Sequence, residues 1–127
     1  MDPQAYVTAF CQRMHEATRV PFESVSVDDW RPEVAHCHEN VTAWVEQNSD
    51  HVAVRGWVTW YAVYNGVRLT PHSVVQAPDG CLFDITPLIN ETERLGMRFV
   101  RHVGDEQTFW EMKAAMNAFD CYDCEAA

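Results

Sequence analysis

Three segments of the chain carry apolar residues at helical spacing, three or four positions apart. The first runs from Pro3 to about residue 17, behind an Asp2 that is typical of a helix N-cap. The second begins between residues 33 and 37 and ends near residue 48. The third follows an N-cap aspartate and covers residues 105–119. The pattern therefore predicts two early helices and one late helix.

Between the second and third helices the pattern changes to alternation and to β-branched and aromatic content, which is typical of strands. Residues 52–64 and 67–76 predict two strands, and Asn65-Gly66 between them is a strong hairpin turn. Shorter strands are expected at 81–86 and 98–102. We expect one α+β domain over residues 1–127, with helices packed on an antiparallel β-meander of three to four strands.

The arrangement of the helices follows from the two apolar faces of this sheet. Ser73, Val75, Phe83 and Ile85 alternate with the residues of the other face and are mostly apolar. A sheet that is apolar on both sides needs cover on both sides. We expect the helix that carries Cys37 on one face and a terminal helix on the other.

The turn at residues 77–81 sets the pairing of the second and third strands. Pro78 and Gly80 stand where a three-residue hairpin loop with a glycine bulge needs them. With that loop, residue 77 pairs with residue 81, so His72 and Asp84 are diagonal neighbours on one face. A loop one residue shorter or longer would place them on opposite faces.

Cys37, His72 and Asp84 are the residue types of a cysteine-nucleophile triad. A thiol is a useful nucleophile only as thiolate, and an imidazole and a helix N-terminus lower its pKa. A carboxylate then fixes the imidazole tautomer and stabilises its charged form. Their order and elements predict Cys37 as nucleophile, His72 as base and Asp84 as its orienting partner.

These blocks resemble the transglutaminase-like branch of the papain-like cysteine enzyme superfamily. The similarity covers about residues 33–90 and is carried by His72-Ser73-Val74-Val75 and Phe83-Asp84-Ile85-Thr86-Pro87. Cys37-His38-Glu39-Asn40-Val41 and Arg55-Gly56-Trp57 are also similar to blocks of small uncharacterised bacterial and phage proteins.

The resemblance implies a papain-like core and an oxyanion site built from the Cys37 backbone N–H and a second donor. Trp57 and Asn40 are the candidates for that donor, and the transglutaminase-like pattern favours the tryptophan. Arg31 stands in the region where papain-like proteases carry a glutamine. A plain papain-like protease is therefore the weaker reading of the resemblance.

Three other interpretations compete with catalysis. Cys37 lies on the same helical stripe as Val41 and Trp44, so it could be a core residue. The protein could be a non-catalytic acidic binding protein, phage-encoded, that blocks a basic surface of a host protein. Cys121 and Cys124 form a C-x-x-C that, with distant histidines, could make a structural zinc module.

Composition limits the class of partner. The net charge is −10, which argues against nucleic-acid binding and favours a basic partner. No apolar run approaches the roughly 20 residues of a membrane span, and the N-terminus lacks the basic start of a secretory signal. Five cysteines without a disulfide spacing predict reduced thiols in a cytoplasmic protein.

Together these features predict a small thiol hydrolase or acyltransferase that needs no cofactor. Its substrate would be the amide or acyl group of a protein or peptide, and its reaction would pass through an acyl-thioenzyme. Deamidase, amidase and isopeptidase activities all fit. We favour deamidation or amide hydrolysis because so small a domain has little room for extended peptide subsites.

Overall fold

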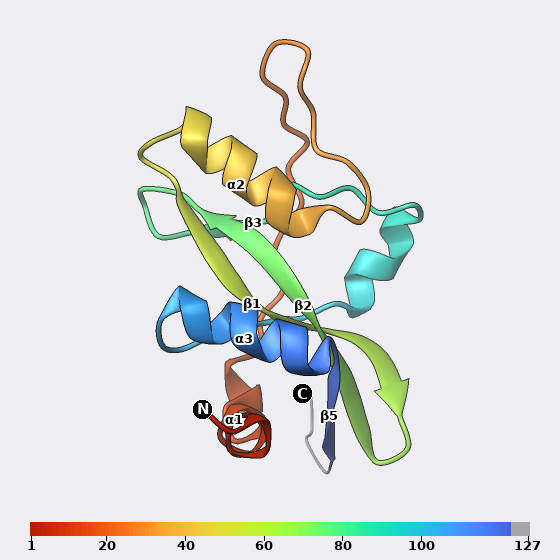
Figure 1. The fold of residues 1–127 in the computed structure, drawn as a ribbon. Helices are drawn as coiled ribbons and strands as arrows, with labels where there is room; N and C mark the ends of the chain where they lie inside the picture. Colours follow the sequence, from red (N-terminus) through yellow and green to blue (C-terminus); the bar gives the residue numbers. More distant parts are fainter. Residues whose placement is uncertain (123–127) are drawn as a thin grey trace.

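The fold was determined as a computed structural model that describes residues 1–122. It is an α+β domain in which helices lie on an antiparallel sheet (Figure 1). In chain order the elements are α1 (Pro3–Cys11), the 3-10 helix η1 (Met14–Glu16), α2 (Cys37–Gln47), β1 (Val52–Val63), β2 (Gly66–Gln76), β3 (Leu82–Phe83), the 3-10 helix η2 (Glu91–Gly96), β4 (Phe99–Arg101), α3 (Glu106–Met116) and β5 (Phe119–Tyr122). The predicted class and the β1-β2-β3 meander are confirmed.

Strands β1 and β2 form a long hairpin that organises the sheet. The predicted hairpin is confirmed, but its turn lies one residue earlier than expected: Val63 pairs with Gly66, so Tyr64 and Asn65 form the turn, and Asn65 has a φ of 62°. Gly66 begins β2, and a Cβ there would collide with the carbonyl oxygen of Cys121 in β5. The glycine thus permits the close approach of β5.

Strand β2 has two different neighbours along one edge. β3 pairs with it at Val75–Gln76, and β5 pairs with it at Gly66–Leu69, while β1 and then β4 lie on the other side. Between these two pairings, residues 70–74 of β2 have no strand partner on that edge within residues 1–122. This gap is where the sheet can be approached from the side.

The two faces of the sheet are covered in different ways. One face holds Trp57 and Val75 and is covered by α1, α2 and α3 (Figure 1). The other face holds Val54, Val58 and Val74. These residues pack with Phe99 of β4 and with residues from segments outside the helices and strands: Val20, Leu88 and Met97. The expected terminal helix on the face opposite to α2 is wrong, since segments without regular helix fill that place.

The third predicted helix also ends earlier than expected. It is capped by Asp105 as predicted, but it stops at Asn117, which adopts a left-handed conformation with φ 56°. Phe119 then belongs to β5, where it and Cys121 point into the core. Its spacing continues the helical stripe of Met112 and Met116, so the sequence pattern alone could not separate the two elements.

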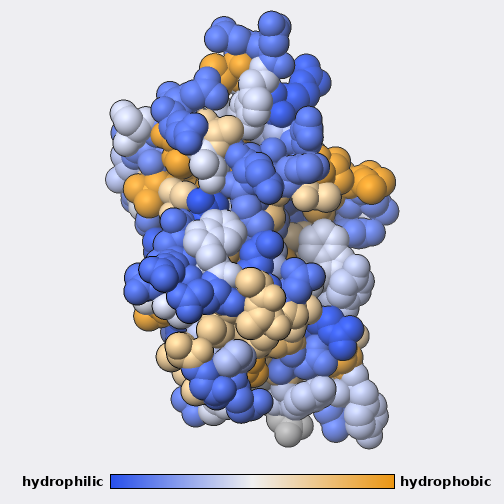
Figure 2. Space-filling model, in the orientation of Figure 1, coloured by the Kyte–Doolittle hydropathy of each residue, from blue (hydrophilic) through white to orange (hydrophobic). Residues whose placement is uncertain are grey.

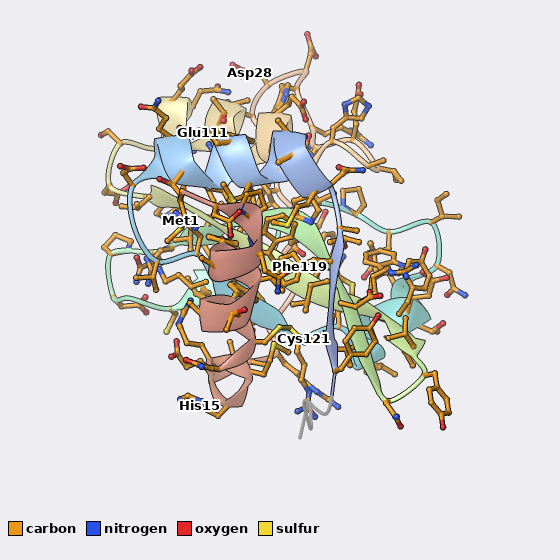
Figure 3. The ribbon with its side chains drawn as sticks, turned by 60° about the horizontal axis from the view of Figure 1, so that its bottom comes forward. Met1, His15, Asp28, Glu111, Phe119 and Cys121 are labelled. Carbon is orange, nitrogen blue, oxygen red and sulfur yellow. A yellow bond between two sulfur atoms is a disulfide. The ribbon has the colours of Figure 1, made fainter. Side chains whose placement is uncertain are left out.

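A disulfide joins Cys11 at the end of α1 to Cys121 in β5 (Figure 3). The expectation of reduced thiols is therefore wrong for these two residues. It also removes Cys121 as a zinc ligand in this state, and its partner in that proposal, Cys124, lies outside the described residues. The bond links the end of α1 to β5, beside the core that these two elements form with α3.

Candidate active site

Helix α2 begins at Cys37, as the triad requires. The preceding Ala35 has a φ of 66° and turns the chain, and His36 occupies the N-cap without a capping side chain. Cys37 is therefore the first residue of the helix, and its backbone N–H has no partner inside it. The positive end of the helix dipole favours a thiolate at this position.

Asn40 holds the segment that leads into this helix. Its Oδ1 accepts from the Glu33 backbone N–H at 3.0 Å, and its Nδ2 donates to the Glu33 carbonyl at 2.8 Å. The same Nδ2 donates to Thr86 Oγ1 at 3.0 Å. Both amide hydrogens are used, so Asn40 has none left for an oxyanion and instead positions Cys37.

His72 and Asp84 meet on one face of the sheet. The observed pairs Val75–Phe83 and Gln76–Leu82 confirm the predicted register, and Gly80 turns the hairpin with a φ of 90°. His72 Nε2 donates to Asp84 Oδ2 at 2.7 Å. The two residues are only 5% and 2% exposed, so little water competes with this hydrogen bond.

Arg94 completes the surroundings of Asp84. Its Nη1 donates to Asp84 Oδ2 at 2.8 Å, and the Thr86 backbone N–H donates to Oδ1 at 3.0 Å. Burial favours the protonated acid, but the charge and hydrogen bond of His72, together with Thr86 and Arg94, lower the pKa of Asp84. The carboxylate is thus ionised and faces the imidazole, and both of its oxygens accept hydrogen bonds.

The gap in the edge of β2 explains how Cys37 reaches His72. Helix α2 packs on the face opposite to His72, with Val41 against Val75. Its first residue nevertheless lines a groove together with Thr70, Pro71 and His72 of β2. Since Asp84 occupies Nε2 of the imidazole, Nδ1 is the nitrogen left for the thiol.

A second imidazole, that of His38, also interacts with the thiol. Ser73 Oγ lies 2.6 Å from His38 Nδ1 and accepts from Arg55 Nη1 at 3.0 Å. Arg55 also donates to Glu106 at 2.7 Å. Each imidazole near Cys37 is therefore held on its other side by a chain of hydrogen bonds that includes an arginine: Ser73 and Arg55 for His38, and Asp84 and Arg94 for His72.

These neighbours change the acidity of the thiol. Burial alone would raise the pKa of Cys37, but hydrogen bonding and charge from His38 and His72 outweigh it and lower the pKa to about 6. Burial likewise favours a neutral His72, while the charge and hydrogen bond of Asp84 and the contact with Cys37 raise its pKa. A thiolate and an imidazolium are the favoured pair at neutral pH.

Trp57 does not lie where the resemblance implied. Its side chain is fully buried in the core with Tyr6, and its only donor, Nε1, bonds the Tyr6 hydroxyl at 3.0 Å. That hydroxyl bonds His102 Nδ1 at 2.7 Å. Trp57, like Asn40, is therefore a structural residue in this fold, and neither can serve as the second oxyanion donor.

A groove of about 480 Å³ opens beside Cys37 and His72. Its other walls come from the segment before α2, from β1 and β2 and from the segment around η2: Val34, Ala35, Val58, Trp60, Thr70, Pro71, Thr86, Leu88, Ile89, Asn90 and Glu93. The volume is in the range of small-ligand sites. A substrate in this groove would lie against the thiol.

The structure brings Cys37, His72 and Asp84 together as the sequence predicts, and it adds four side chains to which the sequence assigned no role: His38, Ser73, Arg55 and Arg94. Ser73 and Arg55 stand in blocks that carry the resemblance, but nothing in those blocks indicates their hydrogen bonds, and Arg94 stands outside them. His38 stands beside Cys37 in another of these blocks. Its place next to Cys37 in the first turn of a helix is the one signal that could have revealed its role.

The structure bears on two other classes of site. Within residues 1–122, no three side chains of His, Cys, Asp or Glu are grouped so that they could hold a metal ion. None of the helices in the same range is both long and apolar enough to cross a membrane.

Comparisons with known proteins identified no relative of this chain. No protein-family model, curated protein or solved structure matches the chain. The case for a function therefore depends on the geometry and electrostatics of the site.

Proposed function

We propose that the protein is a cysteine-dependent enzyme that acts on amide or acyl groups, with Cys37 as nucleophile. His72 is the general acid and base, and Asp84 is its orienting partner. One observation carries the proposal: the thiol with a lowered pKa adjoins an imidazole whose other nitrogen donates to a buried carboxylate. That is the arrangement which activates a nucleophile in acyl transfer.

The reaction would proceed in two stages. The Cys37 thiolate attacks the carbonyl carbon, a C–S bond forms, and the His72 imidazolium donates its proton to the leaving amine as the C–N bond breaks. Water, giving a proton to the now neutral His72, then attacks the thioester and releases the acid and the thiolate. The net reaction consumes one water and converts an amide to an acid and an amine.

The papain-like or transglutaminase-like identity belongs to this proposal. It is supported by a nucleophile at a helix start and by a histidine and an aspartate on two paired segments. The oxyanion donor supported by the fold is the Cys37 backbone N–H, since Trp57 and Asn40 are committed elsewhere. Deamidase, amidase and isopeptidase reactions share this chemistry, and the acidic surface favours a basic protein or peptide as substrate.

An activated ester tests the proposal without knowledge of the natural substrate. Incubation with p-nitrophenyl acetate, followed by acid quench and peptide mass mapping, should find an acetyl group on Cys37 that disappears as product accumulates. Cys81→Ser should behave as the unmodified chain, and Cys37→Ser should give neither acetylation at residue 37 nor turnover. Acetylation confined to Lys113 or the N-terminus would contradict the proposal and favour a non-catalytic binding protein.

A further inference from the structure

The groove beside Cys37 has mostly apolar walls although it is open to solvent. Trp60 and Pro71 from the hairpin and Leu88 from the segment before η2 line it. Ile89 and Val34 stand at its rim and are 93% and 40% exposed. Figure 2 shows hydrophobic surface over the segment that leads into η2. Apolar residues gathered at the mouth of a groove mark a binding surface rather than a random surface position.

A single carboxylate interrupts this apolar lining. Glu93 lines the same groove, and within residues 1–122 its side chain makes no ion pair or hydrogen bond. Its neighbours Glu91 and Arg94 bond to each other at 2.8 Å, so their charges are already paired. The groove therefore offers apolar contact and one unpaired negative charge to its occupant.

The buried charges behind His72 do not change the negative charge that the groove presents to a substrate. Asp84 and Arg94 bond to each other at 2.8 Å and lie behind the imidazole. An anionic substrate would meet the Glu93 carboxylate and the net charge of −10, and among the described residues that line the groove none is a lysine or arginine. A cationic substrate would gain from both.

We propose that this groove selects an acyl donor that carries a bulky apolar side chain next to the reacting carbonyl and a cationic group beside it. A Lys-Leu segment has that chemistry. The inference rests on the proposed function, because it needs Cys37 as the attacking group. It narrows the substrate class from any amide to an apolar and basic peptide segment.

Short chloromethyl ketones test this selection on the whole protein. These reagents alkylate a thiolate, with chloride as leaving group, and their peptide part occupies the groove. We compare lysyl-leucyl, lysyl-glycyl and glutamyl-leucyl chloromethyl ketones, and divide each rate at Cys37 by the iodoacetamide rate of the same variant. The lysyl-leucyl probe should react about tenfold faster than the lysyl-glycyl probe and several-fold faster than the glutamyl-leucyl probe at low salt.

Two test variants, at Ile89 and Glu93, and two control variants, at Leu95 and Glu111, change exposed residues and should fold normally. Ile89→Ser should reduce the leucine-over-glycine ratio, whereas Leu95→Ser, which is 68% exposed and outside the groove, should leave it unchanged. Glu93→Gln should reduce the preference for the lysyl over the glutamyl probe, whereas Glu111→Gln on α3, which removes the same charge outside the groove, should leave it nearly unchanged.

The outcomes separate the two proposals. Equal rates for all three probes, with Cys37 still labelled by iodoacetamide, would overturn the substrate selection and leave the proposed function standing. Failure of iodoacetamide to label Cys37 would overturn the proposed function and the selection with it.

Discussion

Cys37 and Cys81 are the free thiols among residues 1–122, and their surroundings are opposite in character. Cys81 is exposed at the end of the β2–β3 hairpin. The charge of Asp79, and then its hydrogen bond, raise the pKa of this thiol above its usual value of 9.0. Cys37 is half-buried, yet its pKa falls to about 6.

The comparison shows that exposure and reactivity are separate properties. Burial taken alone would make Cys37 the less acidic of the two thiols. Two imidazoles and the start of a helix reverse that order, while one carboxylate makes the accessible thiol less acidic. Because the thiolate is the reacting species, the partly buried cysteine should be the faster one at neutral pH.

The largest effect is expected when Asp84, the carboxylate behind this difference, is changed. Asp84→Asn should reduce turnover of p-nitrophenyl acetate by about three orders of magnitude or more, because an amide can select the wrong imidazole tautomer. It should also lower the free energy of unfolding by roughly 3 kcal/mol, since His72 and Arg94 lose a buried partner. Steady-state kinetics and thermal melting measure the two effects.

Asp120→Asn is the matched control for that prediction. Asp120 also bonds an arginine, Arg68 at 2.8 Å, but it lies on β5 and Arg68 is half-exposed. Its loss should cost about 1 kcal/mol or less and leave turnover unchanged. A folded Asp84→Asn protein with undiminished turnover would show that Asp84 serves only the structure.

Removal of His72 should erase most of the difference between the two thiols. In His72→Gln the amide can still bond Asp84, but the cation beside Cys37 is gone. The pKa of Cys37 should rise by about two units, from about 6 to about 8, so the thiolate fraction and the alkylation rate at pH 7 should fall roughly tenfold. Intact-mass kinetics with iodoacetamide measure this, and an unchanged rate would mean that His72 does not act on the thiol.

His38 should have a smaller influence of the same sign. In His38→Gln, His72 still stabilises the thiolate, so the pKa of Cys37 should rise by only about one unit and alkylation at pH 7 should be about threefold slower. Ser73→Ala removes only the group that bonds His38 Nδ1 and should give a fraction of that loss. A faster reaction in His38→Gln would contradict the stabilising role assigned to this imidazole.

The smallest expected effect concerns the alkylation rate of Cys81. Asp79→Asn removes the charge that raises the pKa of this thiol, so its alkylation at pH 8 should increase about two- to threefold. The rate at Cys37 should not change. If Cys81 kept its rate, Asp79 would not be the cause of its lowered reactivity.

The part of the site that the sequence predicted depends on local chain geometry. Pro78 and Gly80 define the loop length, loop length defines the register, and the register brings His72 to Asp84. The sequence predicted only that the second helix begins between residues 33 and 37, whereas in the structure α2 begins at Cys37. The backbone turn at Ala35 and the hydrogen bonds of Asn40 decide it, and both depend on contacts with residues distant in sequence.

The parts that were missed depend on tertiary contacts with no local pattern. Arg94 reaches Asp84 from the short 3-10 helix η2, and the indole of Trp57 donates in the core to the hydroxyl of Tyr6 from α1. The Cys11–Cys121 bond joins residues 110 positions apart, and cysteine spacing does not define such a pairing. These features follow from how the elements pack.

The pH dependence of alkylation at Cys37 and Cys81 in one sample tests the central claim most directly. The lowered pKa means that the rate at Cys37 rises up to about pH 6 and is level above it, whereas the rate at Cys81 is still low and rising at pH 8 because its pKa lies above 9.0. Between pH 6 and 8 iodoacetamide should therefore label Cys37 first, as read by peptide mass mapping. Labelling of Cys81 before Cys37 across that range would show that Cys37 is an inert core thiol and contradict the account.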